Sequence, residues 1–272
     1  MINHTFTYEM PDSLDKASHT LRQHQGAEIL IGGYGLVQMM KKGAIKPSSI
    51  VSLDEISDLK LISKKSDGLM RIGAANKLSD VLSDAQLQKN FPILMKVVGT
   101  LGDHQMRNQT AIGDKFIYAN NRNGLAPFLA ASGATYTTIN SQGSLKDGLN
   151  GPIGELKDQV LFIDLPVSAD VIFYDEFKDL DSKSAMVSVC FRGSHQNHII
   201  KDCVIFIDGQ KIKFDRLQSV EHYLVGKKID LIDFNELKSS IDLKINTQDV
   251  NQDYIINLIA TFLFNGLKQN FG

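Results

Sequence analysis

The sequence is poor in cysteine, with only Cys190 and Cys203 among its 272 residues. Two thiols cannot bind an iron–sulfur cluster or a cysteine-rich zinc site. They also provide no disulfide framework, which favours a reducing compartment. Both stand in apolar stretches, so we expect buried free thiols. His195 and His198 fall in a polar stretch typical of a turn between strands, and we predict no metal site.

Neither sign of charge is in excess, and long apolar runs are missing. Lys and Arg number 29 against 31 Asp and Glu, a formal net charge of -2, which gives no electrostatic case for nucleic acid or an anionic membrane surface. The longest apolar run, residues 254–264, is shorter than the roughly 18–20 residues of a membrane-spanning helix. The first residues lack a signal-peptide pattern. We therefore expect a cytoplasmic protein with neither nucleic acid nor a membrane as partner.

The pattern of the chain changes near its middle. Hydrophobic residues make up 43% of the sequence, which is enough for a core, and the length allows two modest domains. Helix and strand signals alternate up to Pro166, and β-rich stretches dominate beyond it. We therefore predict two α+β domains, residues 1–168 and 169–272, the second of them smaller and containing an antiparallel sheet.

Local signals predict the individual elements. Asp12 or Ser13 is expected to cap a helix that ends at Gly26. Asp208-Gly209 is typical of a two-residue hairpin turn. Residues 105–125 and the glycine-rich stretch 143–154 are expected to be loops. Expected strands cover 27–31, 50–53, 69–73 and 134–140, and expected helices cover 36–42, 125–131, 217–225 and 249–267, with another beginning at Pro92.

Two glycine-bearing loops are the candidates for binding. Ile31-Gly32-Gly33-Tyr34-Gly35-Leu36 joins a predicted strand to a predicted helix, and backbone amides in such a turn can hold a phosphate. It is not a dinucleotide fingerprint of the Rossmann type, because Gln38 stands where a third glycine is needed. By itself this motif also fits an ordinary strand-to-helix turn. With Thr110-Ala111-Ile112-Gly113, it can hold a diphosphate from two sides. No residues suggest a catalytic nucleophile, and none is predicted.

These loops stand in a longer pattern that resembles the FAD-binding medium subunit or domain of the molybdenum hydroxylases, such as carbon monoxide and xanthine dehydrogenases. The resemblance also rests on residues 11–14 and 71–74, on Gln105-Met106-Arg107-Asn108, and on Arg216, Glu221, Leu224 and Gly226, and so extends over nearly the whole chain.

The resemblance implies the fold, the cofactor and the partners. The fold is a two-part FAD-binding domain of the PCMH/VAO type, followed by an α+β domain like the C-terminal one of the carbon monoxide dehydrogenase flavoprotein. The role is that of an oxidoreductase subunit, in which FAD passes electrons from the clusters of an iron–sulfur small subunit to an acceptor. The substrate would react on a molybdopterin large subunit. The implied cofactor-binding residues are Ile31, Gly32, Gly33, Tyr34, Gly35, Leu36, Thr110, Ile112, Gly113, Asp114, Lys115, Gly124, Leu161 and Lys178.

The departures from the family pattern concentrate at the residues that the resemblance implies for ligand binding. Gly113-Asp114-Lys115 replaces Gly-Gly-Asn, which puts a carboxylate where a glycine lets the backbone approach a diphosphate. Tyr34 replaces a threonine, and Gly124 replaces an acid. Two hypotheses stay open. Either FAD is bound in a shifted mode, with Lys115 and Arg122 contacting phosphate, or the chain has lost FAD and serves as a scaffold or binds another ligand in the same cleft.

Overall fold

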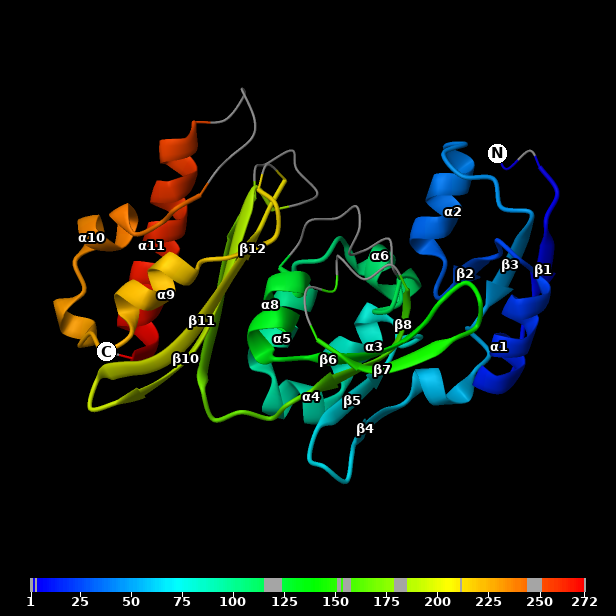
Figure 1. Cartoon of the computed structure of the whole chain (residues 1–272), viewed down its shortest axis with the longest axis horizontal. Helices are drawn as coiled ribbons and strands as arrows, with labels where there is room; N and C mark the ends of the chain where they lie inside the picture. Colours follow the sequence, from blue (N-terminus) through cyan, green and yellow to red (C-terminus); the bar gives the residue numbers. More distant parts are fainter. Residues whose placement is uncertain are drawn as a thin grey trace. The chain divides into compact units, whose positions relative to one another are not determined.

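The computed structural model describes residues 2, 4–114, 124–150, 153, 158–178, 185–210, 212–243 and 251–271. Its contacts divide the chain into two compact units (Figure 1). The first unit comprises Met1–Asn120 and Gly133–Val167, and the second comprises Asn121–Ser132 and Ser168–Gly272. Both units combine helices with sheets, in agreement with the predicted α+β class. Within the described ranges, no helix is long and apolar enough to cross a membrane.

A small parallel sheet with two helices opens the first unit. Its strands lie in the order β1-β3-β2. The Ser13 side chain accepts a hydrogen bond from the Lys16 amide and caps α1, which confirms the predicted cap. Ala17 and Leu21 of α1 are buried in the core. The elements are β1 (Thr7–Glu9), α1 (Leu14–Gln23), β2 (Glu28–Leu30), α2 (Tyr34–Lys41) and β3 (Ser49–Ser52).

A five-stranded antiparallel sheet completes the first unit, in the order β4-β5-β8-β6-β7. β8 is the middle strand of the five, and all seven of its residues are buried. The strands are β4 (Ile62–Lys64), β5 (Met70–Gly73), β6 (Thr135–Ile139), β7 (Leu145–Leu149) and β8 (Gln159–Leu165). The helices of this part are η1 (Ser57–Lys60), α3 (Leu78–Ser83), α4 (Ala85–Asn90), α5 (Pro92–Gly99) and α6 (His104–Gln109).

The second unit is built on an antiparallel sheet, as the sequence predicts, and the strands lie in the order β12-β11-β10-β9. In Figure 1 the long helix α11 lies along β10, and Phe191 of β10 stacks on Phe173 of β9 with ring centroids 4.8 Å apart. The helix α8 packs on β10 and β11. The elements are α8 (Leu125–Ser132), β9 (Val171–Phe177), β10 (Val187–Gln196), β11 (Ile199–Asp208), β12 (Asp215–Arg216), α9 (Gln218–Leu224), η3 (Ile229–Leu231), α10 (Phe234–Ser239) and α11 (Gln252–Phe271).

The tight hairpin lies elsewhere than at Asp208-Gly209. The strand paired with the end of β11 is the short β12, so residues 209–214 separate the two strands and the prediction of a two-residue turn is wrong. The two-residue turn joins β10 to β11 at Asn197 and His198, whose φ angles of 52° and 58° are those of a type I′ turn. This confirms the predicted turn in the histidine-containing stretch.

Two stretches expected to be loops contain regular structure. Residues 104–109 form α6, which begins where the Asp103 carboxylate accepts a hydrogen bond from the Met106 amide. Residues 145–149 form β7, whose side chains are almost all exposed. Neither element has a buried apolar face, so neither leaves a hydrophobic period in the sequence.

Both cysteines are free and buried, as predicted. Burial raises the pKa of the Cys203 thiol to about 12 and raises that of Cys190 further, because a thiolate is poorly solvated in the core. The reactive thiolate is therefore almost absent at pH 8. We expect a colorimetric thiol reagent to label no cysteine in the native protein at pH 8 and two after unfolding in guanidinium. Rapid labelling of the native protein would contradict this burial.

Candidate functional site

The first glycine loop turns sharply between β2 and α2. Gly32 and Gly33 have φ angles of 67° and 73°, in the left-handed region that favours glycine. Gly33 is the N-cap of α2 and offers no side chain to accept a hydrogen bond from the first amides of the helix. These amides carry the positive end of the helix dipole. The loop therefore presents an N-terminus that needs an acceptor from elsewhere.

The second loop supplies the contact that the sequence predicts. A Cβ atom on Gly32 would lie 2.6 Å from the Ala111 Cβ and 2.7 Å from the Ala111 amide nitrogen, so the two loops touch through backbone. Gly113 is equally confined, because a Cβ there would collide with Ala74. Residues 31–36 and 110–114 thus form one site within the first unit, which we call the two-loop site.

Most amides of the second loop already have acceptors. Hydrogen bonds run from the amide of Ile112 to the carbonyl of Asn76, from Gly113 to Ala74, and from Asp114 to Ala111, at 2.8, 2.9 and 3.0 Å. The Gln159 side-chain amide donates to the carbonyl of Gly113 at 2.5 Å. These bonds hold the loop rigidly, and they leave the three amides unavailable to a ligand.

Two carboxylates occupy amides of the first loop. Asp114 Oδ2 accepts a hydrogen bond from the Gly35 amide at 2.9 Å, and Asp54 Oδ1 accepts one from the Gly32 amide at 2.8 Å. Asp114 is only 3% exposed. The structure therefore places negative charge, supplied by the chain itself, on the amides that were expected to hold a phosphate.

The remaining predicted residues fall into distinct surroundings. Ile31, Leu36 and Leu161 are core residues, and the Leu161 carbonyl accepts a hydrogen bond from the Ala74 amide. Tyr34 is half-buried at the first turn of α2. Thr110 is fully buried, and its hydroxyl forms no hydrogen bond within the described part of the chain.

Three predicted residues are not part of the two-loop site as described. Gly124 and Lys178 belong to the second unit, where Gly124 packs against Tyr174 and Lys178 pairs with Glu176 at 3.1 Å. Lys115 lies outside the described residues, as does Arg122. Among the residues that the structure describes, no group of His, Cys, Asp and Glu is arranged to hold a metal ion.

Sequence reasoning missed Asp54 and Gln159, which shape the loops from other elements. Asp54 follows β3, and Gln159 begins β8 and is 2% exposed. A polar residue directly before the apolar run of residues 160–163 was the only signal for Gln159. Arg107 also holds the turn before α6, because its Nη1 donates to the carbonyls of Gly99, Leu101 and Gly102.

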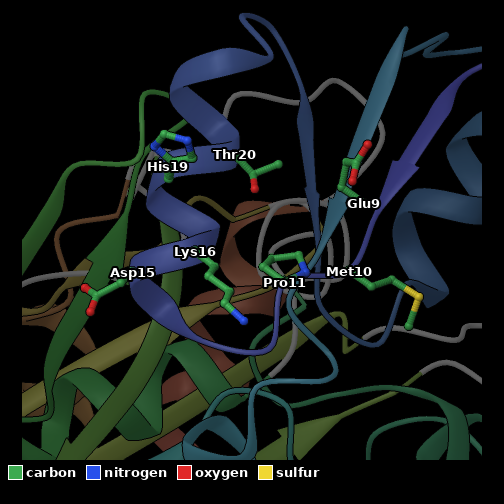
Figure 2. Close-up of a pocket in the computed structure, with 7 residues that line it drawn as sticks. All are labelled: Glu9, Met10, Pro11, Asp15, Lys16, His19 and Thr20. Atoms are coloured by element: carbon green, nitrogen blue, oxygen red, sulfur yellow. The ribbon is translucent and has the colours of Figure 1, made fainter.

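A surface groove lies beside α1, apart from the glycine loops (Figure 2). It is lined by Glu9, Met10, Pro11, Asp15, Lys16, His19 and Thr20. Its charged side chains are exposed, and Lys16 pairs with Asp12 at 2.7 Å. The groove has no buried polar group directed into it, so its chemistry does not identify a ligand.

The fold and the two glycine loops point to a class of protein, and comparison with known families identifies that class. Residues 4–150 match the model of the FAD binding domain in molybdopterin dehydrogenase. That match covers more than half of the chain. The chain belongs to this family.

Relatives among known proteins agree with this assignment. The chain is 26% identical over 258 residues to the glyceraldehyde dehydrogenase medium chain of Sulfolobus acidocaldarius, covering 89% of this chain and 88% of that one. It is 31% identical over 114 residues to the carbon monoxide dehydrogenase medium chain of Hydrogenophaga pseudoflava, an alignment that spans 42% of this chain and 39% of the relative.

Solved structures show the same fold over almost the whole length. A chain of quinoline 2-oxidoreductase from Pseudomonas putida 86 superposes with a TM-score of 0.83 at 21% identity, covering 99% of this chain and 98% of that one. A chain of Hydrogenophaga pseudoflava carbon monoxide dehydrogenase gives the same TM-score at 20% identity, with 98% of each chain covered. The predicted two-part FAD-domain fold with an α+β C-terminal part is therefore confirmed.

The two-loop site fits a dinucleotide in its backbone but not in its charge. Gly32 and Gly113 allow close approach of backbone, as a diphosphate cradle requires. The Asp114 carboxylate, however, already binds the Gly35 amide from a buried position. Two unit charges about 4 Å apart repel by about 4 kcal/mol at an effective dielectric constant of 20. As arranged here, the residues do not fit a bound diphosphate.

Proposed function

We propose that this chain is the medium subunit of a molybdenum-hydroxylase-type oxidoreductase. The observation that carries the proposal is the family match over residues 4–150 together with a whole-chain likeness to a medium chain. In this role the subunit would assemble with an iron–sulfur small subunit and a molybdopterin large subunit. Its contribution to the enzyme would be electron transfer, for which the family's cofactor is FAD.

Co-purification tests the subunit role. A tagged chain, co-expressed with candidate iron–sulfur and molybdopterin subunits from the same genome, should retain both through size-exclusion chromatography at constant stoichiometry. The same tag on an unrelated protein is the control. If the chain elutes alone under all salt conditions, the proposed assembly is wrong, whatever its flavin content.

The Asp114 contact favours a second candidate function. In this chain a carboxylate is hydrogen-bonded to an amide that was expected to bind phosphate. A homologue with this arrangement can keep the fold and the assembly surfaces while losing the cofactor. Such a subunit would serve as a scaffold in the complex. Flavin released by denaturing the purified complex distinguishes the two roles, since a stoichiometric yield supports the electron-transfer role and a negligible yield supports the scaffold.

A further inference from the structure

Helix α2 receives its cap from a residue distant in sequence. Gly33 at the N-cap has no side chain, and Gly35, the second helical residue, donates its amide to Asp114 Oδ2 instead. The two residues are 79 positions apart. A side-chain oxygen on the amide of the second or third helical residue is what a local N-cap normally provides. Asp114 therefore performs the task of an N-cap across the loop-to-loop contact.

The same amide is needed by any anion that binds at this helix end. A phosphate at a helix N-terminus is held by the free amides of the first turn and by the helix dipole. One amide satisfies one acceptor well, so the carboxylate and a phosphate oxygen compete for Gly35. Asp114 is 3% exposed, and its own amide is bonded to the carbonyl of Ala111. The backbone of Asp114 is therefore held beside the helix end, with its carboxylate out of contact with water.

We infer that Asp114 is an internal anion that occupies the N-terminus of α2 and lowers the affinity of the two-loop site for a dinucleotide diphosphate. This inference rests on the proposed function, because it takes FAD as the dinucleotide. The backbone at position 114 is one that any residue can adopt, since Asp114 is not among the residues with positive φ. Removing its charge therefore removes the repulsion that a diphosphate would meet at this helix end, without reshaping the turn.

Titration with two flavins tests the inference on the full chain. We expect Asp114→Asn, which keeps the shape of the side chain, to bind FAD about tenfold or more tightly than the native chain, as judged by quenching of flavin fluorescence. Riboflavin, which has no phosphate, should bind equally to both. Asp58→Asn is the matched control, because it removes the same charge from an exposed position in the same unit and should change neither affinity.

Thermal unfolding without flavin gives an independent readout. Loss of the charged cap should lower the Tm of Asp114→Asn by about 2–4 °C, and Asp114→Ala, which has no acceptor, should lose more. Adding FAD should raise the Tm of Asp114→Asn more than that of the native chain. A destabilised variant with higher FAD affinity is the combined result that we expect.

The outcomes separate this inference from the proposed function. If the native chain binds FAD as tightly as Asp114→Asn, the inference is wrong and FAD binding stands. If Asp58→Asn gains as much affinity as Asp114→Asn, the effect is one of net charge and the inference is again wrong. If no folded variant binds FAD, both the inference and the cofactor of the proposed function fail. Co-purification then still decides the subunit role.

Discussion

Replacing Gly32 by alanine is expected to lower the free energy of unfolding by about 2–5 kcal/mol. A left-handed backbone costs an ordinary residue about 1–2 kcal/mol, and Gly32 has a φ of 67°. The added Cβ would also lie 2.7 Å from the Ala111 amide nitrogen, so the two loops must move apart, which adds about 1–3 kcal/mol. Urea denaturation followed by circular dichroism measures the loss.

Gly26→Ala is the matched control for this change. Gly26 has a φ of 78°, but a Cβ there would meet no atom within 4 Å. Its cost should be limited to the backbone, about 1–2 kcal/mol. The difference between the variants reports the contact between the loops. Equal losses would mean that the two loops are not in contact in solution.

Asp164→Ala is expected to be the most damaging charge substitution, with a loss of about 2–4 kcal/mol. Asp164 has a side chain 5% exposed in β8 and binds Arg71 through two hydrogen bonds of 2.7 Å, with Lys65 at 3.0 Å. The hydrogen bond to Asp164 raises the pKa of Arg71. Without the carboxylate, the partly buried Arg71 guanidinium, which lies 4.6 Å over the Phe162 ring, would lose the counter-ion to which it is hydrogen-bonded.

Asp67→Ala controls for the loss of a carboxylate next to Lys65. Asp67 contacts Lys65 at 3.1 Å, but its side chain is 51% exposed. Exposed pairs contribute about 0–1 kcal/mol, so this variant should be nearly as stable as the native chain. Chemical denaturation of both variants at pH 7 measures the contrast. A stable Asp164→Ala variant would show that the buried cluster is replaceable by apolar packing.

The sequence was sufficient for elements with a clear hydrophobic pattern. The antiparallel sheet of the second unit and α9 follow from such patterns. The polar stretch between two of its strands likewise marks the turn at Asn197-His198. It was insufficient where burial is absent, as in α6 and β7. Asp208-Gly209 shows a different limit, because a turn-forming pair needs a long partner strand beside it, and β12 has only two residues.

The candidate site, like the fold, could be predicted only in part from the sequence. Gly32 and Gly113 lie where other atoms approach the backbone so closely that a Cβ atom would collide, and the sequence identifies both residues. It also identifies Asp114 as an obstacle to a diphosphate. It does not reveal that Asp114 binds the Gly35 amide or that Asp54 binds the Gly32 amide. Such bonds depend on which side chain tertiary folding brings to a helix end, and no local pattern encodes them. The predicted boundary at 168/169 and the cofactor roles of the site residues stay predictions.

The position of α8 in the chain has a consequence for biosynthesis. Seven of its residues are buried, and it packs on β10 and β11, which are synthesised much later. Until Asp208 has emerged from the ribosome, this apolar segment lacks the strands that cover it. Nascent chains with such a surface are prone to aggregate. A nascent chain with this helix exposed therefore needs protection by chaperones, and the need ends when the strands pack on the helix.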